Sequence, residues 1–177
     1  MLRALPCLAL LVNACGPAAG TEEEPKKPDP CTEMPAHALV KGLPNTSPDG
    51  INFKLDSVIG LFDESTSRGS FGATETYDST VNFSLFFDSP PSAGTSSAPP
   101  SMGWPYLHDI EVKSEVNGPT WAITDPAATD YVLQVDSVCP SVRTGQTQKF
   151  ILHGKATATL KPENSGASGN LDAVVTF

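Results

Sequence analysis

Few side chains in this sequence have the types and spacing that catalysis requires. The three histidines, His37, His108 and His153, are far apart, and none belongs to a His-Glu-x-x-His motif, which places two imidazoles on one metal. Asp109 and Glu111 share one face of an extended strand, as a glycosidase pair would, but a solvated sheet face produces the same spacing. The chain has no Gly-x-Ser-x-Gly elbow and no phosphate-binding glycine pattern. We therefore predict no catalytic residue, no metal site and no cofactor.

Cysteine is the other reactive side chain, and one of the four cysteines follows an apolar run near the N-terminus. Arg3 precedes the run from Ala4 to Val12, which is typical of an export signal and too short to cross a bilayer. The junction Leu-Val-Asn-Ala-Cys at residues 11–15 resembles the lipobox of bacterial lipoproteins. This resemblance implies a signal peptide at residues 1–14 and fatty-acid attachment, of the palmitate type, to Cys15. The alternative is ordinary cleavage near Gly16, which would leave a soluble secreted protein.

The resemblance also implies where the protein is held. Gly16 follows Cys15, whereas an aspartate at this position holds lipoproteins of the enteric type at the inner membrane. We therefore expect an outer-membrane protein that faces the periplasm or the cell surface. Residues 15–30 contain four prolines and a run of three glutamates, which is typical of an extended tether.

Two cysteines remain for the folded part if the signal peptide removes Cys7 and acylation consumes Cys15. Cys31 and Cys139 have neither the spacing of a redox Cys-x-x-Cys motif nor enough partners for a zinc site. In an oxidising envelope compartment we expect them to form a disulfide bond.

Composition and charge limit the remaining possibilities. The chain has 177 residues and a formal net charge of −9, with no cluster of Lys and Arg, so nucleic acid is excluded as an expected partner. Residues 31–177 are long enough for one domain with its own core.

Most of this domain alternates apolar and polar residues with a period of two, which indicates antiparallel strands with one solvated face. We predict an all-β antiparallel β-sandwich of the immunoglobulin-like or Greek-key type, with about seven or eight strands. Gly154, in the middle of a long apolar run, is expected at a bulge or bend, and Trp121 is expected in the core. Phe86 stands as an extra aromatic residue in the run Val81–Phe87. The segments expected to form strands are residues 51–55, 81–87, 109–113, 131–136, 150–160 and 171–177.

The longest irregular stretch, residues 88–106, ends in Met102, Trp104 and Tyr106. Aromatic residues at the base of such a loop could bind a partner or could cap the end of the sandwich. We expect a lipid-anchored, non-catalytic adaptor that contacts protein or glycan as an accessory subunit of an adhesion, secretion or surface-motility assembly. The alternative is an inhibitor or capture module for cationic proteins, which the negative charge would attract. An envelope hydrolase and a small outer-membrane β-barrel are less favoured hypotheses.

Overall fold

The computed structural model describes residues 31–57, 60–75, 80–97, 105–123 and 131–177. The signal peptide at 1–14, the tether at 15–30 and Cys15 lie outside these residues. In the described part every regular element is a strand, and no helix there is long and apolar enough to span a membrane. The eleven strands are β1 (Ala36–Lys41), β2 (Ile51–Ser57), β3 (Gly60–Asp63), β4 (Arg68–Glu75), β5 (Val81–Phe87), β6 (Gly94–Ser97), β7 (Tyr106–Lys113), β8 (Thr120–Ala122), β9 (Tyr131–Thr144), β10 (Thr147–Pro162) and β11 (Leu171–Thr176).

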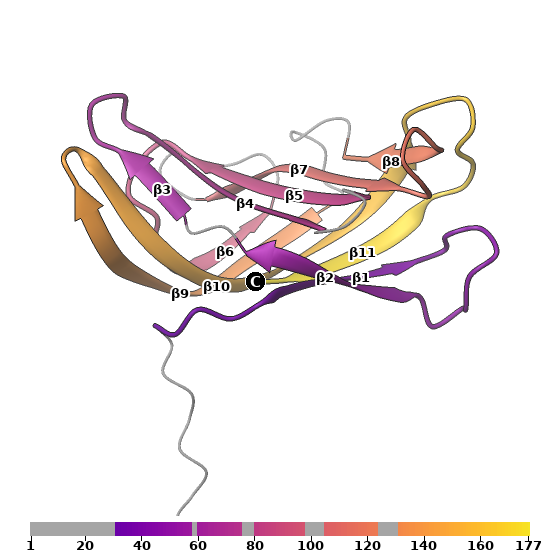
Figure 1. The fold of residues 1–177 in the computed structure, drawn as a ribbon, viewed down its shortest axis with the longest axis horizontal. Coiled ribbons are helices and arrows are strands. Elements are labelled where there is room, and N and C mark those ends of the chain that lie inside the picture. The colour runs from indigo at the N-terminus through magenta and orange to yellow at the C-terminus, as the bar shows by residue number, and fades with distance from the viewer. Residues whose placement is uncertain (1–30, 58–59, 76–79, 98–104, 124–130) are drawn as a thin grey trace, which may run out of the picture.

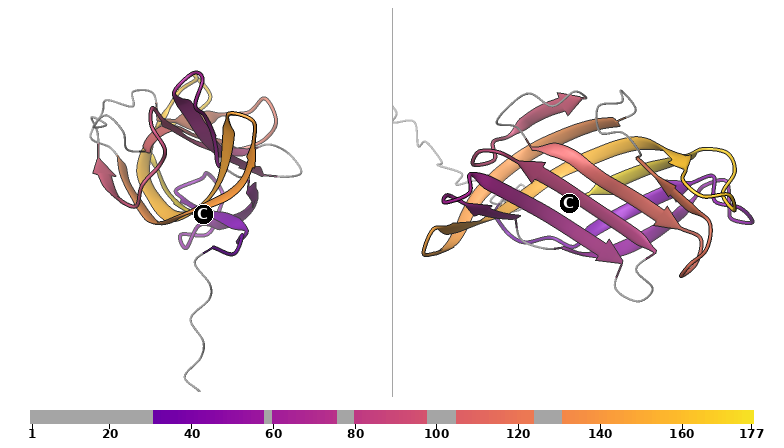
Figure 2. Two further views of the ribbon diagram at one scale, coloured as in Figure 1. Left: turned by 90° about the vertical axis from the view of Figure 1, so that its left-hand side faces the viewer. Right: turned by 90° about the horizontal axis from the view of Figure 1, so that it is seen from above.

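The strands form one antiparallel sheet that folds back on itself. The hydrogen-bonded order is β11-β1-β2-β4-β5-β7-β8-β10-β9-β6, and β11 also pairs with β10, so the path returns to β10. Short β3 joins β4 to the far end of β10. Strands β4, β5 and β7 make one layer, and β9, β10, β11, β1 and β2 make the layer opposite (Figure 1; Figure 2, left).

The all-β antiparallel prediction is therefore confirmed, with a larger number of strands among the described residues than expected. There are eleven strands rather than seven or eight. Six of the twelve strand pairings join strands that are consecutive in sequence, and the other six join strands further apart along the chain, such as β2 with β4 and β5 with β7. Among the strands outside the expected segments, β3, β6 and β8 have only three or four residues each, too few to show a period of two, whereas β1 has six residues that alternate.

The space between the two layers is filled by inward side chains from nearly every strand. Strand β5 alternates strictly between buried and half-buried residues, as its sequence predicts. The rings of Phe71, Phe83 and Phe177 meet at the centre, with the Phe177 centroid 5.3 Å from that of Phe71 and 5.2 Å from that of Phe83. Trp121 is fully buried, as expected, and its Nε1 donates a hydrogen bond to the Gly169 carbonyl at 3.0 Å.

Among the described residues the strand register shifts at three places, and two of these bulges bear on the core and the candidate site; the third lies between Gln148 and Phe150 in the pairing of β10 with β9. The predicted one is confirmed, because the pairing of β10 with β9 shifts between His153 and Gly154. A β-carbon at Gly154 would lie 2.2 Å from the backbone oxygen of Gln134, so only glycine fits. The second bulge lies in β7, where Asp109 pairs with Ser84 but the next pair toward the start of β7 is Leu107 with Leu85. His108 is thus the additional residue, and Phe86 occupies an ordinary outward position.

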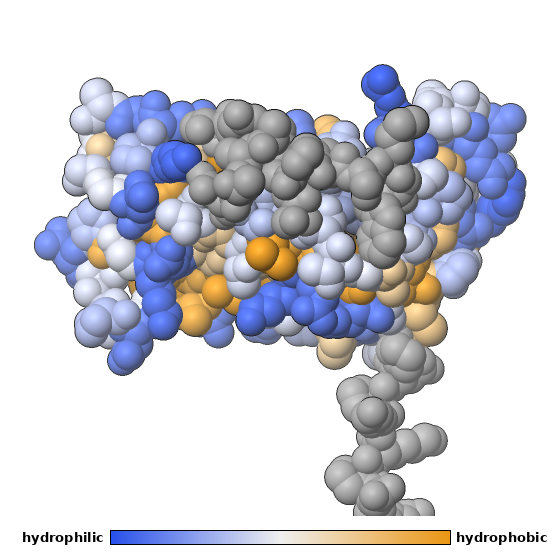
Figure 3. All heavy atoms as spheres, turned by 180° about the vertical axis from the view of Figure 1, so that it is seen from behind, coloured by the Kyte–Doolittle hydropathy of each residue, from blue (hydrophilic) through white to orange (hydrophobic). Residues whose placement is uncertain are grey.

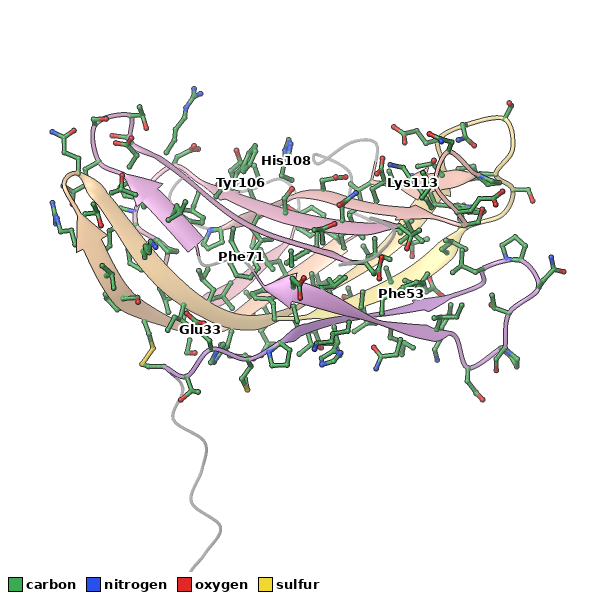
Figure 4. All side chains as sticks on the ribbon, viewed as in Figure 1. Glu33, Phe53, Phe71, Tyr106, His108 and Lys113 are labelled. Carbon is green, nitrogen blue, oxygen red and sulfur yellow. A yellow bond between two sulfur atoms is a disulfide. The ribbon has the colours of Figure 1, made fainter. Side chains whose placement is uncertain are left out.

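The predicted disulfide between Cys31 and Cys139 is confirmed, with the two Cα atoms 5.4 Å apart and a sequence separation of 108. It ties the first described residue of the chain to strand β9. In Figure 4 the yellow sulfur–sulfur bond lies below the lower layer of strands.

Candidate functional site

A surface groove lies at one end of the β4-β5-β7 layer. Its volume is about 940 Å³, and its lining comes from the β3–β4 hairpin, the end of β5 and the start of β7. Strand register explains the arrangement, because Leu61 pairs with Ser70, Ser70 with Phe86, and Phe86 with Tyr106. These four outward positions form one row across four strands.

Three aromatic side chains gather in the groove on the outer face of the sheet; we call Phe86, Tyr106 and His108 the ring cluster. The His108 ring lies flat on Phe86, with centroids 3.9 Å apart and planes 16° apart. The Tyr106 ring meets Phe86 edge-on, at 6.3 Å and 87°. The labelled side chains Tyr106 and His108 stand on the outer side of the upper layer (Figure 4).

The bulge in β7 is what creates this cluster. Without an additional residue, strict alternation would leave a single outward position between Leu107 and Ile110. The bulge instead aims both His108 and Asp109 outward, and the exposed imidazole reaches the Phe86 ring. Bulges often re-aim side chains in this way near functional sites.

Charged groups of both signs line the same groove. The Ser65 hydroxyl and amide donate hydrogen bonds to Asp63 at 2.6 and 2.8 Å, which hold the pKa of that carboxyl below its ordinary value. Partial burial raises the pKa of the Tyr106 phenol, the Asp88 carboxylate raises it further, and Arg68 opposes this effect. At neutral pH the groove therefore offers carboxylate acceptors, a guanidinium and a protonated phenol.

A hydrogen-bonded row of polar side chains crosses the same outer face toward the other end of the molecule. Thr74 Oγ1 donates to Asn82 Oδ1 at 2.6 Å, and Asn82 Nδ2 donates to Glu111 Oε1 at 3.2 Å. Lys113 Nζ lies 2.7 Å from the same Glu111 oxygen. Burial raises the pKa of Asp109, and repulsion from Glu111 adds to that rise. Asp109 and Glu111 thus share a face as expected, with Glu111 held by two partners.

Some large apolar side chains outside the groove are also exposed. Seen from behind, polar surface predominates at the ends of the molecule, with apolar patches between them (Figure 3). Isolated exposed aliphatic residues are ordinary on a protein surface. The large ones outside the groove are Met34, Ile51, Val116, Val132 and Val142.

Of the predicted binding residues, the structure places Tyr106 in the groove, whereas Met102 and Trp104 lie outside the described residues. Phe86, His108 and the β3–β4 hairpin were not predicted as site residues. The available signal was Phe86 itself, an aromatic residue at a position where alternation calls for a polar one. His37 and His153 lie on β1 and β10, away from the groove lining, and no group of three or more metal-ligating side chains occurs among the described residues.

Comparison with protein-family models, with curated proteins and with solved structures gives no match. The fold and groove alone therefore define the class, an antiparallel all-β domain with an aromatic groove on one outer face.

Proposed function

We propose that this protein is a lipid-anchored, non-catalytic binding protein of the cell envelope, which holds a partner in the groove of the β4-β5-β7 layer. The anchor would be Cys15 and the location the outer membrane. The partner would belong to an outer-membrane or surface assembly that this chain serves as an accessory subunit.

The ring cluster is the observation that carries this proposal. An outward position on a solvated sheet face is ordinarily polar, yet Phe86 and Tyr106 occupy a pair of such positions and His108 covers Phe86. Aromatic residues are favoured at binding surfaces because they supply a large rigid contact area. Arg68 beside the rings adds a planar hydrogen-bond donor of the kind that interfaces favour.

The placement of the groove suits a protein tethered through its N-terminal segment. Cys31 and the labelled Glu33 lie on the lower layer, and Tyr106 and His108 lie on the outer side of the upper layer (Figure 4). Cys31, where the proposed tether joins the domain, and the groove therefore lie on opposite layers. One acyl chain binds a membrane only marginally, whereas two or more hold a protein stably, as lipoprotein-type modification would.

Two experiments in the native host test the two parts of the proposal, site-specific photo-crosslinking for the groove and palmitate labelling for the anchor. The photoreactive residue replaces Ser70, which is exposed in the groove, or Val116, which is exposed in the β7–β8 turn at the other end of the molecule. We expect a defined crosslinked product from position 70 and none from position 116. Metabolic palmitate labelling of the same cells should mark the wild-type chain and leave a Cys15→Ala version unmarked.

The two readouts separate the two parts. Equal crosslinking from both positions, or none from position 70, would contradict the groove as binding surface. Equal labelling with and without Cys15 would contradict the anchor.

A further inference from the structure

We propose that the ligand of the groove is a neutral carbohydrate chain. This inference rests on the proposed function and names the chemical class that the groove would hold. Three features of the groove support it: the arrangement of the rings, the balance of charges, and the size of the space.

The rings form a platform rather than a cage. His108 lies flat on Phe86 and Tyr106 meets Phe86 edge-on, so both rings pack against Phe86 and leave no open centre between Phe86 and either neighbour. A cage for an alkylammonium group needs rings arranged around an open centre, where each face can contact the cation. A flat exposed ring instead suits a flat apolar surface, and the C–H face of a pyranose ring is such a surface.

The polar groups around the rings can form hydrogen bonds with sugar hydroxyls. Each sugar hydroxyl can both donate and accept a hydrogen bond. Asp63 and Asp88 can only accept when ionised, Arg68 can only donate, and the Ser70 hydroxyl does both. With carboxylates and a guanidinium side by side, the groove lacks the single sign of charge that would select a polyanion or a polycation.

The space is suited to several sugar units rather than one. A volume of about 940 Å³ lies near the upper end of the range for small-molecule sites, roughly 300–1,000 Å³. Leu61, Arg68, Ser70 and His108 are all exposed, so the groove lies along the surface and its lining crosses the strands from β3 to β7. A ligand can therefore enter from the side and continue beyond the groove, as a polysaccharide must.

Affinity electrophoresis of the full chain in native gels tests this inference. The gels contain a soluble β-1,4-glucan, an α-1,4-glucan, a galactomannan or the neutral polysaccharide fraction of the host envelope. We expect at least one of them to retard the wild-type chain. His108→Ala and Tyr106→Ala should each weaken that retardation about tenfold or more, and His108→Phe, which restores a flat ring, should retain most of it.

Thr159→Ala is the matched control, because Thr159 lies on the outer face of β10, outside the groove, and its loss should not change retardation. Circular dichroism of each variant would show that the fold persists.

If no polysaccharide retards the wild-type chain, or if the groove variants are retarded as strongly as the wild type, the inference is wrong. Retardation that high salt abolishes would also contradict it, because a neutral ligand does not depend on charge. Crosslinking of a protein from position 70 with no retardation by any polysaccharide would overturn the carbohydrate inference and leave the proposed binding function standing.

Discussion

Among the individual residues, Asp109 is a carboxyl that the bulge holds in a half-buried position beside the groove, where its ionised form lowers stability. The bulge places this carboxyl half-buried on the outer face of β7, where desolvation disfavours its charge and Glu111 repels it. Its pKa is therefore higher in the folded than in the unfolded chain. Such a group lowers the free energy of unfolding when it is ionised. This loss of stability is absent below the ordinary pKa, where the carboxyl is protonated in both states. It grows as the pH rises toward the raised pKa and is complete above it.

We predict that Asp109→Asn stabilises the protein near neutral pH and has little effect at about pH 3. The gain should stay below about 1 kcal/mol, because solvent screens a half-exposed group. Thermal unfolding of both chains at several pH values would measure it. Glu111→Gln is the control and should not stabilise, because Glu111 binds Lys113 and Asn82 as a carboxylate. A gain from Asp109→Asn that is equal at both pH values would contradict this account.

At the scale of the element, the bulges at Gly154 and His108 adjust strands whose sequence pattern is otherwise regular. The one at Gly154 lies in the middle of the longest strand, β10, where the register with β9 shifts. Gly154 also exchanges backbone hydrogen bonds with Phe177, at 2.7 and 3.0 Å, while the Phe177 ring fills the centre of the core. A single glycine therefore couples β9, β10 and the residue that follows β11.

We predict that Gly154→Ala destabilises the protein by about 1–3 kcal/mol, because the added methyl group would meet the Gln134 oxygen at 2.2 Å and the Phe177 ring at 2.9 Å. Gly72→Ala in β4 is the matched control. Its methyl group would meet only the Phe83 oxygen, at 3.6 Å, which is an ordinary contact. The control should be neutral or stabilising by about 0.4–1 kcal/mol, since alanine restricts the unfolded chain. Urea unfolding would measure both, and equal effects would show that the bulge tolerates a side chain.

For the whole molecule, the disulfide and the closure of the sheet act together. Strand β1 pairs with β2 on one side and β11 on the other, so the first strand completes the path that returns to β10. The disulfide fastens the segment just before β1 to β9. A force applied to the chain before Cys31 would therefore act directly on β9 as well as on the start of β1.

We predict that reduction of the disulfide lowers the free energy of unfolding substantially. The cysteines are 108 residues apart, and the chain-entropy model gives about 4.7 kcal/mol for a loop of about that size. Thermal unfolding with and without a reductant would show the loss as a lower melting temperature. A Cys31→Ser, Cys139→Ser double variant should melt at the lower temperature in both conditions. An unchanged melting temperature on reduction would mean that the cross-link restrains little of the unfolded chain.

Much of the fold was predictable from sequence because the side-chain period of a strand is local. The alternation in residues 81–87 and 131–135 identified both the strands and their buried faces, whereas in residues 51–55 it identified the strand but only Leu55 of its apolar residues is fully buried. The cysteine pairing followed from the small number of cysteines that remained, and Gly154 followed from its place in a long apolar run. The short strands β3, β6 and β8 were not predicted, because three or four residues carry no period that composition can reveal. Strand β1 was also missed, although its six residues do alternate between buried and less buried positions.

The sequence by itself determined that this chain forms strands, which side chains face inward, and which two cysteines could pair, since each depends on residue type and a period of two. Only the tertiary structure decided that Leu61, Ser70, Phe86 and Tyr106 form one row, and that a bulge in β7 lays His108 on Phe86. The physical reason is that strand pairing joins segments distant in sequence. The packing of all the inward side chains into one closed core decides which strands become neighbours and in what register. Alternation within a single strand predicts neither the neighbours nor the register.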